Sequence, residues 1–290
     1  ERIIALQNRM VFFDLWWQSV DTANAARLLT ASGDLRYHLE TIRRFKPHTL
    51  SEPEEKLINL KNTTGRSAVN TLYDLLTNGL TFTLTIGGKR KTLTREQLSS
   101  HIRSPKARVR EAAYKELHRV FGGQQDMVGE MYSTLVSDWK NENLTLRKFS
   151  EPVAARNLSN DVPDEAVTAL LSACVKNAGV FQDYFRLKGR LCKITPMNRY
   201  HLYAPHPADR AHYRYPDAVR MVLDAYRSFS PTLADLVQRV IDERHLDARM
   251  RPGKLHGAYC YSVVPGVTPY VLLNYTGEAR DVATLAHELG

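Results

Sequence analysis

The chain has 290 residues, of which 43% are hydrophobic, and it carries a formal net charge of +9 at pH 7. This length and apolar content are enough for one large domain or two smaller ones. No stretch has the roughly 18 uninterrupted apolar residues of a membrane span, and no basic start followed by an apolar run indicates a secretion signal. The sequence therefore predicts no membrane as a partner.

The positive charge is spread along the chain. Acidic and basic residues alternate in stretches such as "SHIRSPKARVREAAYKEL", and the densest basic clusters, 89–91 and 106–110, are short. A protein that binds nucleic acid usually gathers its basic residues on one face, whereas scattered charge is typical of a solvated surface. We therefore expect no nucleic acid as a partner.

The three cysteines, Cys174, Cys192 and Cys260, lie far apart in the sequence. An odd number at these spacings gives neither a disulfide framework nor a C-x-x-C metal pair. Such cysteine usage favours a reducing compartment, so the sequence predicts a cytoplasmic protein.

Helical periodicity dominates the N-terminal half. Helices are expected at 2–30, 34–44, 105–121 and 124–148. Two more are expected between them, one that begins after Ser51 as N-cap and one that ends at Gly79. Between them, "LTFTLTIGGKRKTLT" alternates in hydrophobicity around two glycines, which predicts a β-hairpin at about 80–93. Thr94 with Gln97 three residues later is a capping box that starts the next helix.

Helices also fill most of the C-terminal half. One is expected at 163–192, and two more begin at Pro216 and Pro231, the second running to about 246. The connection "YHLYAPHPADRAHYRYP" before them holds His201, His206 and His212 and is interpreted as a surface loop, since its histidines fit no familiar zinc spacing.

Two strands are expected near the end of the chain. "KLHGAYCYSV" and "TPYVLLNY" predict a short sheet at about 255–275, joined by "VPGV". The regular alternation of strand and helix found in doubly wound sheets is absent. The fold class is therefore mainly α with small β elements, and we expect a helical lobe with a hairpin at 1–150 and the start of a second domain at 151–290.

The last seven residues, "TLAHELG", stop inside a pattern. H-E-x-x-H needs a second histidine four residues after His287, which is one position beyond Gly290. Apolar residues spaced i, i+3, i+4, i+7 form a stripe at Val282, Leu285, Ala286 and Leu289. His287 lies off that stripe, so the helix can pack on one side and present imidazoles on the other.

Two imidazoles on adjacent helical turns can bind one zinc ion. Glu288 is then the natural general base for a metal-bound water. The alternative interpretation is a His-Glu pair on the surface of a helix that has no chemical role.

The first of the two strands offers small residues where a ligand backbone can approach. Gly257 and Ala258 carry little side chain, and a peptide can add itself to a sheet edge through backbone hydrogen bonds. We therefore expect Gly257, Ala258 and Tyr259 to bind substrate, although plain core packing explains each of them equally well. Cys260 is expected to be a buried small hydrophobe.

The stretch "GAYCYSVVPGVTPYVLLNYTGEARDVATLAHELG" is similar to the approach to the zinc helix in the oligoendopeptidase F branch of the thimet-like (M3) metallopeptidases. That branch has a Gly-Ala-Tyr strand, a second strand ending in Leu-Leu/Met-Asn-Tyr/Trp and a helix with His-Glu-Leu/Met-Gly-His. "FKPHTLSEPEEKL" and "YHLYAP" resemble family segments in the same order. The resemblance covers the chain from about Phe45 onward.

This resemblance implies a helical, two-lobed zincin-type fold around a deep channel, in which one zinc ion cleaves short peptides. It makes His287 a zinc ligand, Glu288 the catalytic base and 151–290 the start of the catalytic domain. The family's other zinc ligands and oxyanion-stabilising groups have no counterpart here, so we expect an inactive fragment of a cytoplasmic oligopeptidase. The competing hypothesis is a basic helical scaffold that binds RNA or a protein partner.

Overall fold

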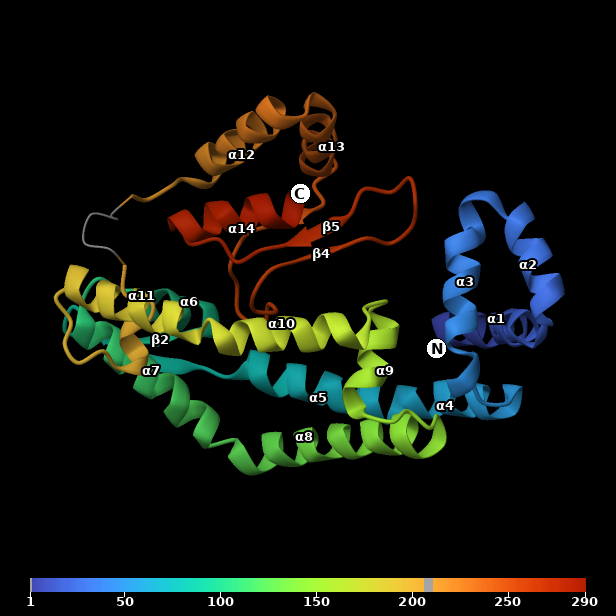
Figure 1. Ribbon diagram of the computed structural model, residues 1–290. Helices are drawn as coiled ribbons and strands as arrows, with labels where there is room; N and C mark the ends of the chain where they lie inside the picture. Colours follow the sequence, from blue (N-terminus) through green and yellow to red (C-terminus); the bar gives the residue numbers. More distant parts are fainter. Residues whose placement is uncertain (1, 206–210) are drawn as a thin grey trace. The chain divides into compact units, whose positions relative to one another are not determined.

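The computed structural model describes residues 2–205 and 211–290. It divides into two compact units, each made from two segments: Glu1–Tyr73 with Gln125–Gln182, here called unit 1, and Asp74–Gln124 with Asp183–Gly290, called unit 2. Helices dominate both units (Figure 1), which confirms the mainly α class with small β elements. The expected domains 1–150 and 151–290 stay a prediction.

Unit 1 consists of helices and their connections, with no strand among its described residues. Its elements are α1 (Arg2–Ser19), α2 (Thr22–Ala31), α3 (Arg36–Arg44), α4 (Glu52–Thr64), the first part of α5 (Arg66–Gly79), α8 (Gln125–Trp139), a π-helical turn (Lys140–Leu146), α9 (Pro152–Ser159), α10 (Asp164–Lys176) and the start of α11 (Ala178–Leu191). The capping box expected at Ser51 is present and involves Glu54.

Two helices that we expected to be continuous are interrupted. The helix expected at 2–30 breaks because the Asp21 carboxylate accepts a hydrogen bond from the Asn24 backbone N–H at 3.0 Å and caps a new helix, α2. The helix expected at 163–192 breaks at Asn177, whose side chain donates to the Ala173 carbonyl at 2.8 Å. In both places a side chain competes with the helix for backbone groups.

Two ion pairs join the two segments of unit 1: Arg44 with Asp161, and Arg147 with Glu55. The Arg147 guanidinium binds both carboxylate oxygens of Glu55, at 2.7 and 2.9 Å, and also contacts Glu142 at 3.1 Å. Burial by itself raises the pKa of Glu55, but hydrogen bonds from Arg147 and from the Leu50 backbone N–H outweigh it, so the pKa lies below its usual value. The carboxylate is therefore held in its charged form.

Unit 2 contains the predicted hairpin. Strands β1 (Phe82–Ile86) and β2 (Lys89–Leu93) pair antiparallel, and α6 (Arg95–Ile102) and α7 (Ala107–Gly122) follow. The capping box of α6 is confirmed: the Thr94 N–H donates to Gln97 Oε1 at 2.9 Å and the Gln97 N–H donates to Thr94 Oγ1 at 3.3 Å. The apolar core of this part comprises Phe82, Leu84, Leu93, Leu98 and Ala113.

The second core of unit 2 lies among helices and a small sheet. These elements are α12 (Tyr215–Phe229), α13 (Pro231–Asp242), β3 (Leu246–Asp247), β4 (Tyr259–Tyr261), β5 (Tyr270–Leu272) and α14 (Ala279–Leu289). The sheet has the order β3-β5-β4, with β3 parallel and β4 antiparallel to β5. The sequence predicted β4 and β5 but not β3, because the helix expected to reach 246 ends at Asp242.

The histidine-containing connection is not simply a surface loop. His201 is buried and its Nδ1 accepts a hydrogen bond from the Asn198 backbone N–H at 3.1 Å. Burial and the nearby Arg110 lower the pKa of His201. His212 packs against the turn before α14, while His206 lies outside the described residues.

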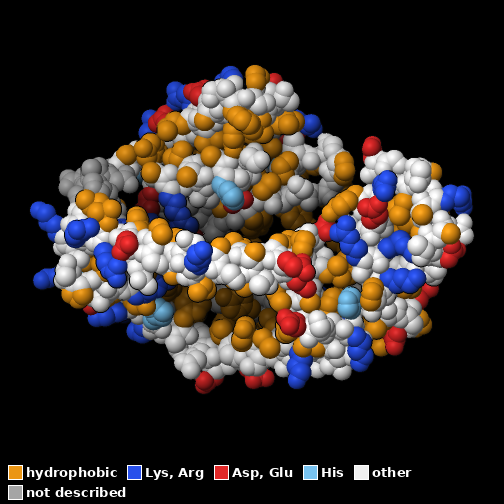
Figure 2. Space-filling model, viewed as in Figure 1, with side chains coloured by type: hydrophobic (Ala, Val, Ile, Leu, Met, Phe, Trp, Pro, Cys, Tyr) orange, Lys and Arg blue, Asp and Glu red, His pale blue; other side chains and the backbone are white. Residues whose placement is uncertain are grey.

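Charge on the surface is mixed. Lys and Arg side chains are interspersed with Asp and Glu side chains over the visible face (Figure 2). None of the helices in residues 2–205 and 211–290 is both long and apolar enough to cross a membrane.

Lys254 ties the loop after β3 to the end of β5. Its side chain is 2% exposed, and its ammonium donates to the carbonyls of Asp247, Arg249 and Leu273 at 2.9, 3.0 and 2.6 Å. It also contacts the Asp247 carboxylate at 3.1 Å. Hydrogen bonds from Arg251 and Lys254 outweigh burial and lower the pKa of Asp247 to about 2.

We expect Lys254→Met to destabilise the protein, because it removes the donor to the partly buried Leu273 carbonyl and an ion-pair partner of the Asp247 carboxylate. The loss should be about 3 kcal/mol, or roughly 5–10 °C in Tm. Arg251→Met is the matched control, since Arg251 binds the same carboxylate from a mostly exposed position and its loss should lower the Tm far less. Thermal unfolding of both variants checks this, and equal losses would contradict the structural role of Lys254.

Candidate functional site

The helix that ends the chain, α14, begins at a closely hydrogen-bonded turn. Asp281 Oδ2 accepts four hydrogen bonds: from the N–H and hydroxyl of Thr276 at 2.7 and 2.5 Å, and from the N–H groups of Gly277 and Glu278 at 2.9 and 3.1 Å. The Glu278 carboxylate in turn accepts from the Asp281 backbone, which completes a capping box. The start and direction of α14 are thereby fixed. This capping signal, Glu278 followed three residues later by Asp281, was not predicted from the sequence.

Gly277 is required at this turn for two reasons. Its φ is +96°, and a Cβ atom there would lie 2.1 Å from the His212 ring. The Tyr213 N–H donates to the Gly277 carbonyl, and the Tyr275 hydroxyl donates to the Tyr213 carbonyl, both at 2.9 Å. The segment before α12 therefore packs directly on the turn and restricts it.

The apolar stripe expected on α14 is confirmed. Leu285 is 0% exposed, and Val282, Ala286 and Leu289 pack around the same core. Near the end of the helix, the Tyr226 hydroxyl from α12 donates to the Ala286 carbonyl. Burial raises the pKa of Tyr226, so this hydroxyl keeps its proton as a donor.

His287 and Glu288 lie away from this core. His287 is exposed and Glu288 is half-buried, and Ala283, one turn before His287, is also exposed. Neither side chain makes a hydrogen bond or an ion pair with a residue that the structure describes. Both are therefore available for chemistry, in the geometry that the helical spacing predicts.

The residues present provide only part of a metal site. His287 offers one exposed imidazole, which is a suitable zinc ligand. Among residues 2–205 and 211–290, however, no three His, Cys, Asp or Glu side chains gather closely enough to hold a metal ion. A complete zinc centre would need ligands beyond this set.

Strand β4 forms an edge of the three-stranded sheet and contacts α14. Tyr259, Cys260 and Tyr261 are all exposed, so the expectation of a buried Cys260 is wrong for the described residues. Since β4 pairs only with β5 in the described sheet, its side chains are less covered than those of a central strand.

The two small residues before β4 differ in what they leave open. Both backbone polar groups of Gly257 are occupied: its N–H donates to Glu96 Oε1 and its carbonyl accepts from Asn274 Nδ2, each at 3.0 Å. Gly257 therefore offers a ligand no free backbone hydrogen-bonding group, only the space that the absent side chain leaves. Ala258 is half-buried and packs partly against the α12–α14 core.

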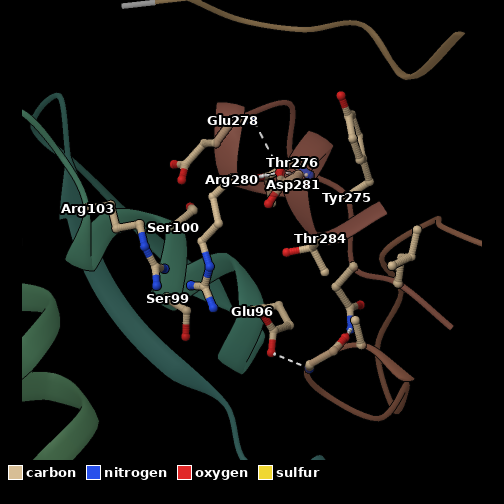
Figure 3. Close-up of a pocket in the computed structure, with 14 residues that line it drawn as sticks. Glu96, Ser99, Ser100, Arg103, Tyr275, Thr276, Glu278, Arg280, Asp281 and Thr284 are labelled. Carbon is tan, nitrogen blue, oxygen red and sulfur yellow. Dashed lines mark hydrogen bonds between the residues drawn. The ribbon is translucent and has the colours of Figure 1, made fainter. Parts of the chain in front are cut away.

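A pocket of about 100 Å³ lies beside the first turns of α14 (Figure 3). It is enclosed by α6, by the turn between β5 and α14, and by the two small residues before β4. The lining residues are Glu96, Ser99, Ser100, Arg103, Gly257, Ala258, Leu273, Asn274, Tyr275, Thr276, Glu278, Arg280, Asp281 and Thr284. Sequence reasoning missed the α6 residues, since nothing local links them to a helix some 180 positions later.

The chain has recognisable relatives. It matches the description "Peptidase family M3" over residues 100–290 and "Oligopeptidase F" over residues 16–82. Oligopeptidase PepF of Bacillus subtilis is 26% identical over 257 residues, which are 87% of this chain and 38% of that protein. The oligoendopeptidase F homolog of Borreliella burgdorferi is 24% identical over 263 residues, 89% of this chain and 43% of that protein. The chain thus spans about two fifths of these relatives.

Solved structures share the fold. PZ peptidase A, determined with an inhibitor, superposes with a TM-score of 0.78 at 19% identity, covering 99% of this chain and 49% of that one. The oligoendopeptidase-F of Enterococcus faecium gives 0.63 at 18% identity, covering 83% and 47%. Because the match to the M3 description extends over most of the sequence, from residue 100 to residue 290, this chain belongs to peptidase family M3, in its oligoendopeptidase F-like branch.

Proposed function

We propose that this chain provides part of the active site of a zinc-dependent endopeptidase that hydrolyses short peptides within an enclosed channel. The observation that carries the proposal is the position of His287 on α14, on the side away from buried Leu285, with the half-buried Glu288 next to it. Membership of family M3 supports a peptidase. It also weighs against the RNA- or protein-binding scaffold, which no contact in the described residues favours.

His287 is assigned as one ligand of the zinc ion. Because no further ligand set lies among the described residues, the other ligands belong to a part of the protein outside them. Relatives more than twice as long as the matched region leave room for such a part. Zinc, when bound, supplies Lewis acidity and lowers the pKa of a coordinated water.

Glu288 is assigned as the general base. Its carboxylate is half-buried and uncommitted, so it can accept a proton from the attacking water and pass it to the amide nitrogen that leaves. The fixed start of α14 at Asp281 and its support by Tyr226 hold this carboxylate in a defined place. A base must be positioned within hydrogen-bond reach of its proton before its pKa matters.

Strand β4 is assigned to the peptide substrate. Its outer edge has no partner strand in the described sheet, and it lies against α14. Backbone pairing on such an edge binds peptides with little dependence on sequence. Ala258 and Tyr259 are the residues at that edge, and Gly257 gives room for close approach.

The proposed setting is the cytoplasm. Cys174, Cys192 and Cys260 are all free thiols, which suits a reducing compartment. Short peptides are the proposed substrates, by analogy with relatives named oligopeptidases.

In the full-length protein, we expect Glu288→Gln to retain zinc but to lose most of the peptidase turnover, at least a hundredfold, because an amide cannot accept the proton. His287→Ala should lose both zinc and turnover. Metal analysis together with cleavage of a quenched peptide distinguishes the two variants. Near-normal turnover of Glu288→Gln would disprove the assignment of Glu288 as the base.

The 290-residue chain by itself should bind zinc weakly, since His287 is a single ligand where three protein ligands are usual. Metal analysis after dialysis checks this, with His287→Ala as the control. Tight stoichiometric binding that depends on His287 would contradict the expectation.

Ala258→Val in the full-length protein should weaken peptide cleavage while zinc content and Tm change little, because the larger side chain obstructs the edge of the cleft. Ala258→Gly is the matched control and should leave cleavage nearly unchanged. If Ala258 is only part of the core, valine should instead overpack it and cost about 1–3 kcal/mol of stability. A fall in Tm with normal kinetics of the folded protein would leave the strand as scaffolding.

A further inference from the structure

Two arginines line the pocket beside α14 without a carboxylate partner among the described residues. Arg280 lies in the first turn of α14 and Arg103 follows the last turn of α6. Their side chains point into the same part of the pocket, near Ser99 and Ser100 (Figure 3). Arg103 also lies over the Tyr203 ring at 5.2 Å, which holds its guanidinium plane in place.

The pocket's three carboxylates all accept hydrogen bonds from backbone N–H groups. Glu96 accepts from the Gly257 N–H, Asp281 accepts from the turn before α14, and Glu278 accepts from the Asp281 N–H. Each carboxylate keeps its negative charge but is directed at these donors, whereas the two guanidinium groups make no ion pair among the described residues. Two serine hydroxyls beside the guanidinium groups add neutral donors.

We propose that Arg280, together with Arg103, binds a carboxylate of the peptide substrate and so sets the specificity of the site. Guanidinium groups are matched to carboxylates because they donate two parallel, charge-assisted hydrogen bonds. This inference rests on the proposed peptidase function and deepens it by naming the chemical group that the enzyme recognises away from the cleaved bond.

The helix places this pocket at a defined distance from the catalytic base. Arg280, Thr284 and Glu288 follow one another at four-residue spacing, so they lie on one side of α14. Eight residues at 1.5 Å each separate Arg280 from Glu288 by about 12 Å along the axis. An extended peptide covers that distance in three or four residues at about 3.3 Å each.

The bound carboxylate can come from two sources, an Asp or Glu side chain or the C-terminus of the peptide. In either case it should lie about three or four residues from the cleaved bond. A peptide ammonium held by Glu96 or Glu278 is the competing arrangement, and the test includes it.

The test uses the full-length enzyme and internally quenched peptides that differ in one group. One pair carries Glu or Gln at the third or fourth residue from the cleaved bond, and a second pair ends in a free acid or an amide. We expect the wild-type enzyme to prefer the carboxylate form of one pair, which identifies the source. Arg280→Gln and Arg103→Gln should each reduce this preference in kcat/KM by roughly ten- to a hundredfold, mainly through KM.

Two further variants make the comparison specific. Arg280→Lys should keep part of the preference, because a lysine retains the charge but loses the paired donors. Arg220→Gln removes an exposed arginine of α12 and should leave the preference unchanged. Binding of the same peptides to the Glu288→Gln enzyme, measured by fluorescence anisotropy, should follow the same order without any turnover.

Each contrary result has its own meaning. Equal cleavage of both members of each pair, or a preference that survives Arg280→Gln, overturns the inference and leaves the peptidase function intact. Loss of cleavage on acetylating the peptide N-terminus, reproduced by Glu96→Gln, identifies an ammonium site and also overturns it. An enzyme that neither binds nor cleaves any of the peptides overturns the proposed function and this inference together.

Discussion

The carboxylate of Asp281 is the constraint on which the functional part of the molecule depends. One oxygen gathers four donors from three consecutive residues, in a turn that only glycine can occupy at position 277. The helix can start at one place only and leave in one direction. Leu285 then enters the core, which places His287 on the opposite side of the helix and Glu288 at the flank of the apolar stripe. A shift of the helix start by one residue would rotate that side by about 100°.

The small sheet beside α14 is likewise held by one charged side chain, that of Lys254. Lys254 donates to carbonyls of two segments, Asp247 and Arg249 at the end of β3 and Leu273 after β5. This lysine contributes no chemistry to the site, but it keeps β5 in register with β3, and β4 pairs with β5. The position of the free edge of β4 therefore depends on the pairing of β3 with β5, which the buried Lys254 ammonium group stabilises.

Local patterns predicted the elements whose causes are local. The hairpin, the capping boxes at Ser51 and Thr94, and the apolar stripe of α14 all depend on residues within a few positions of one another. The breaks at Asp21 and Asn177 were missed because apolar periodicity continues across them while a single polar side chain decides the outcome. The burial of His201 and the exposure of Cys260 depend on distant packing. The α6 wall of the pocket likewise arises from a contact such as Glu96 with Gly257, 161 positions away, which no pattern in the sequence records.

The ion pair of Arg147 with Glu55 has a consequence for the order of events during synthesis. The two residues are 92 positions apart, and the segment between them includes the whole hairpin of unit 2. While a ribosome makes the chain, Glu55 stays without its partner until that intervening segment has emerged. At about 5–20 residues per second this delay lasts roughly 5–20 seconds. The first segment of unit 1 cannot pack against its second segment until the hairpin has had time to fold. This chain order therefore favours folding of the hairpin of unit 2 before unit 1 is complete.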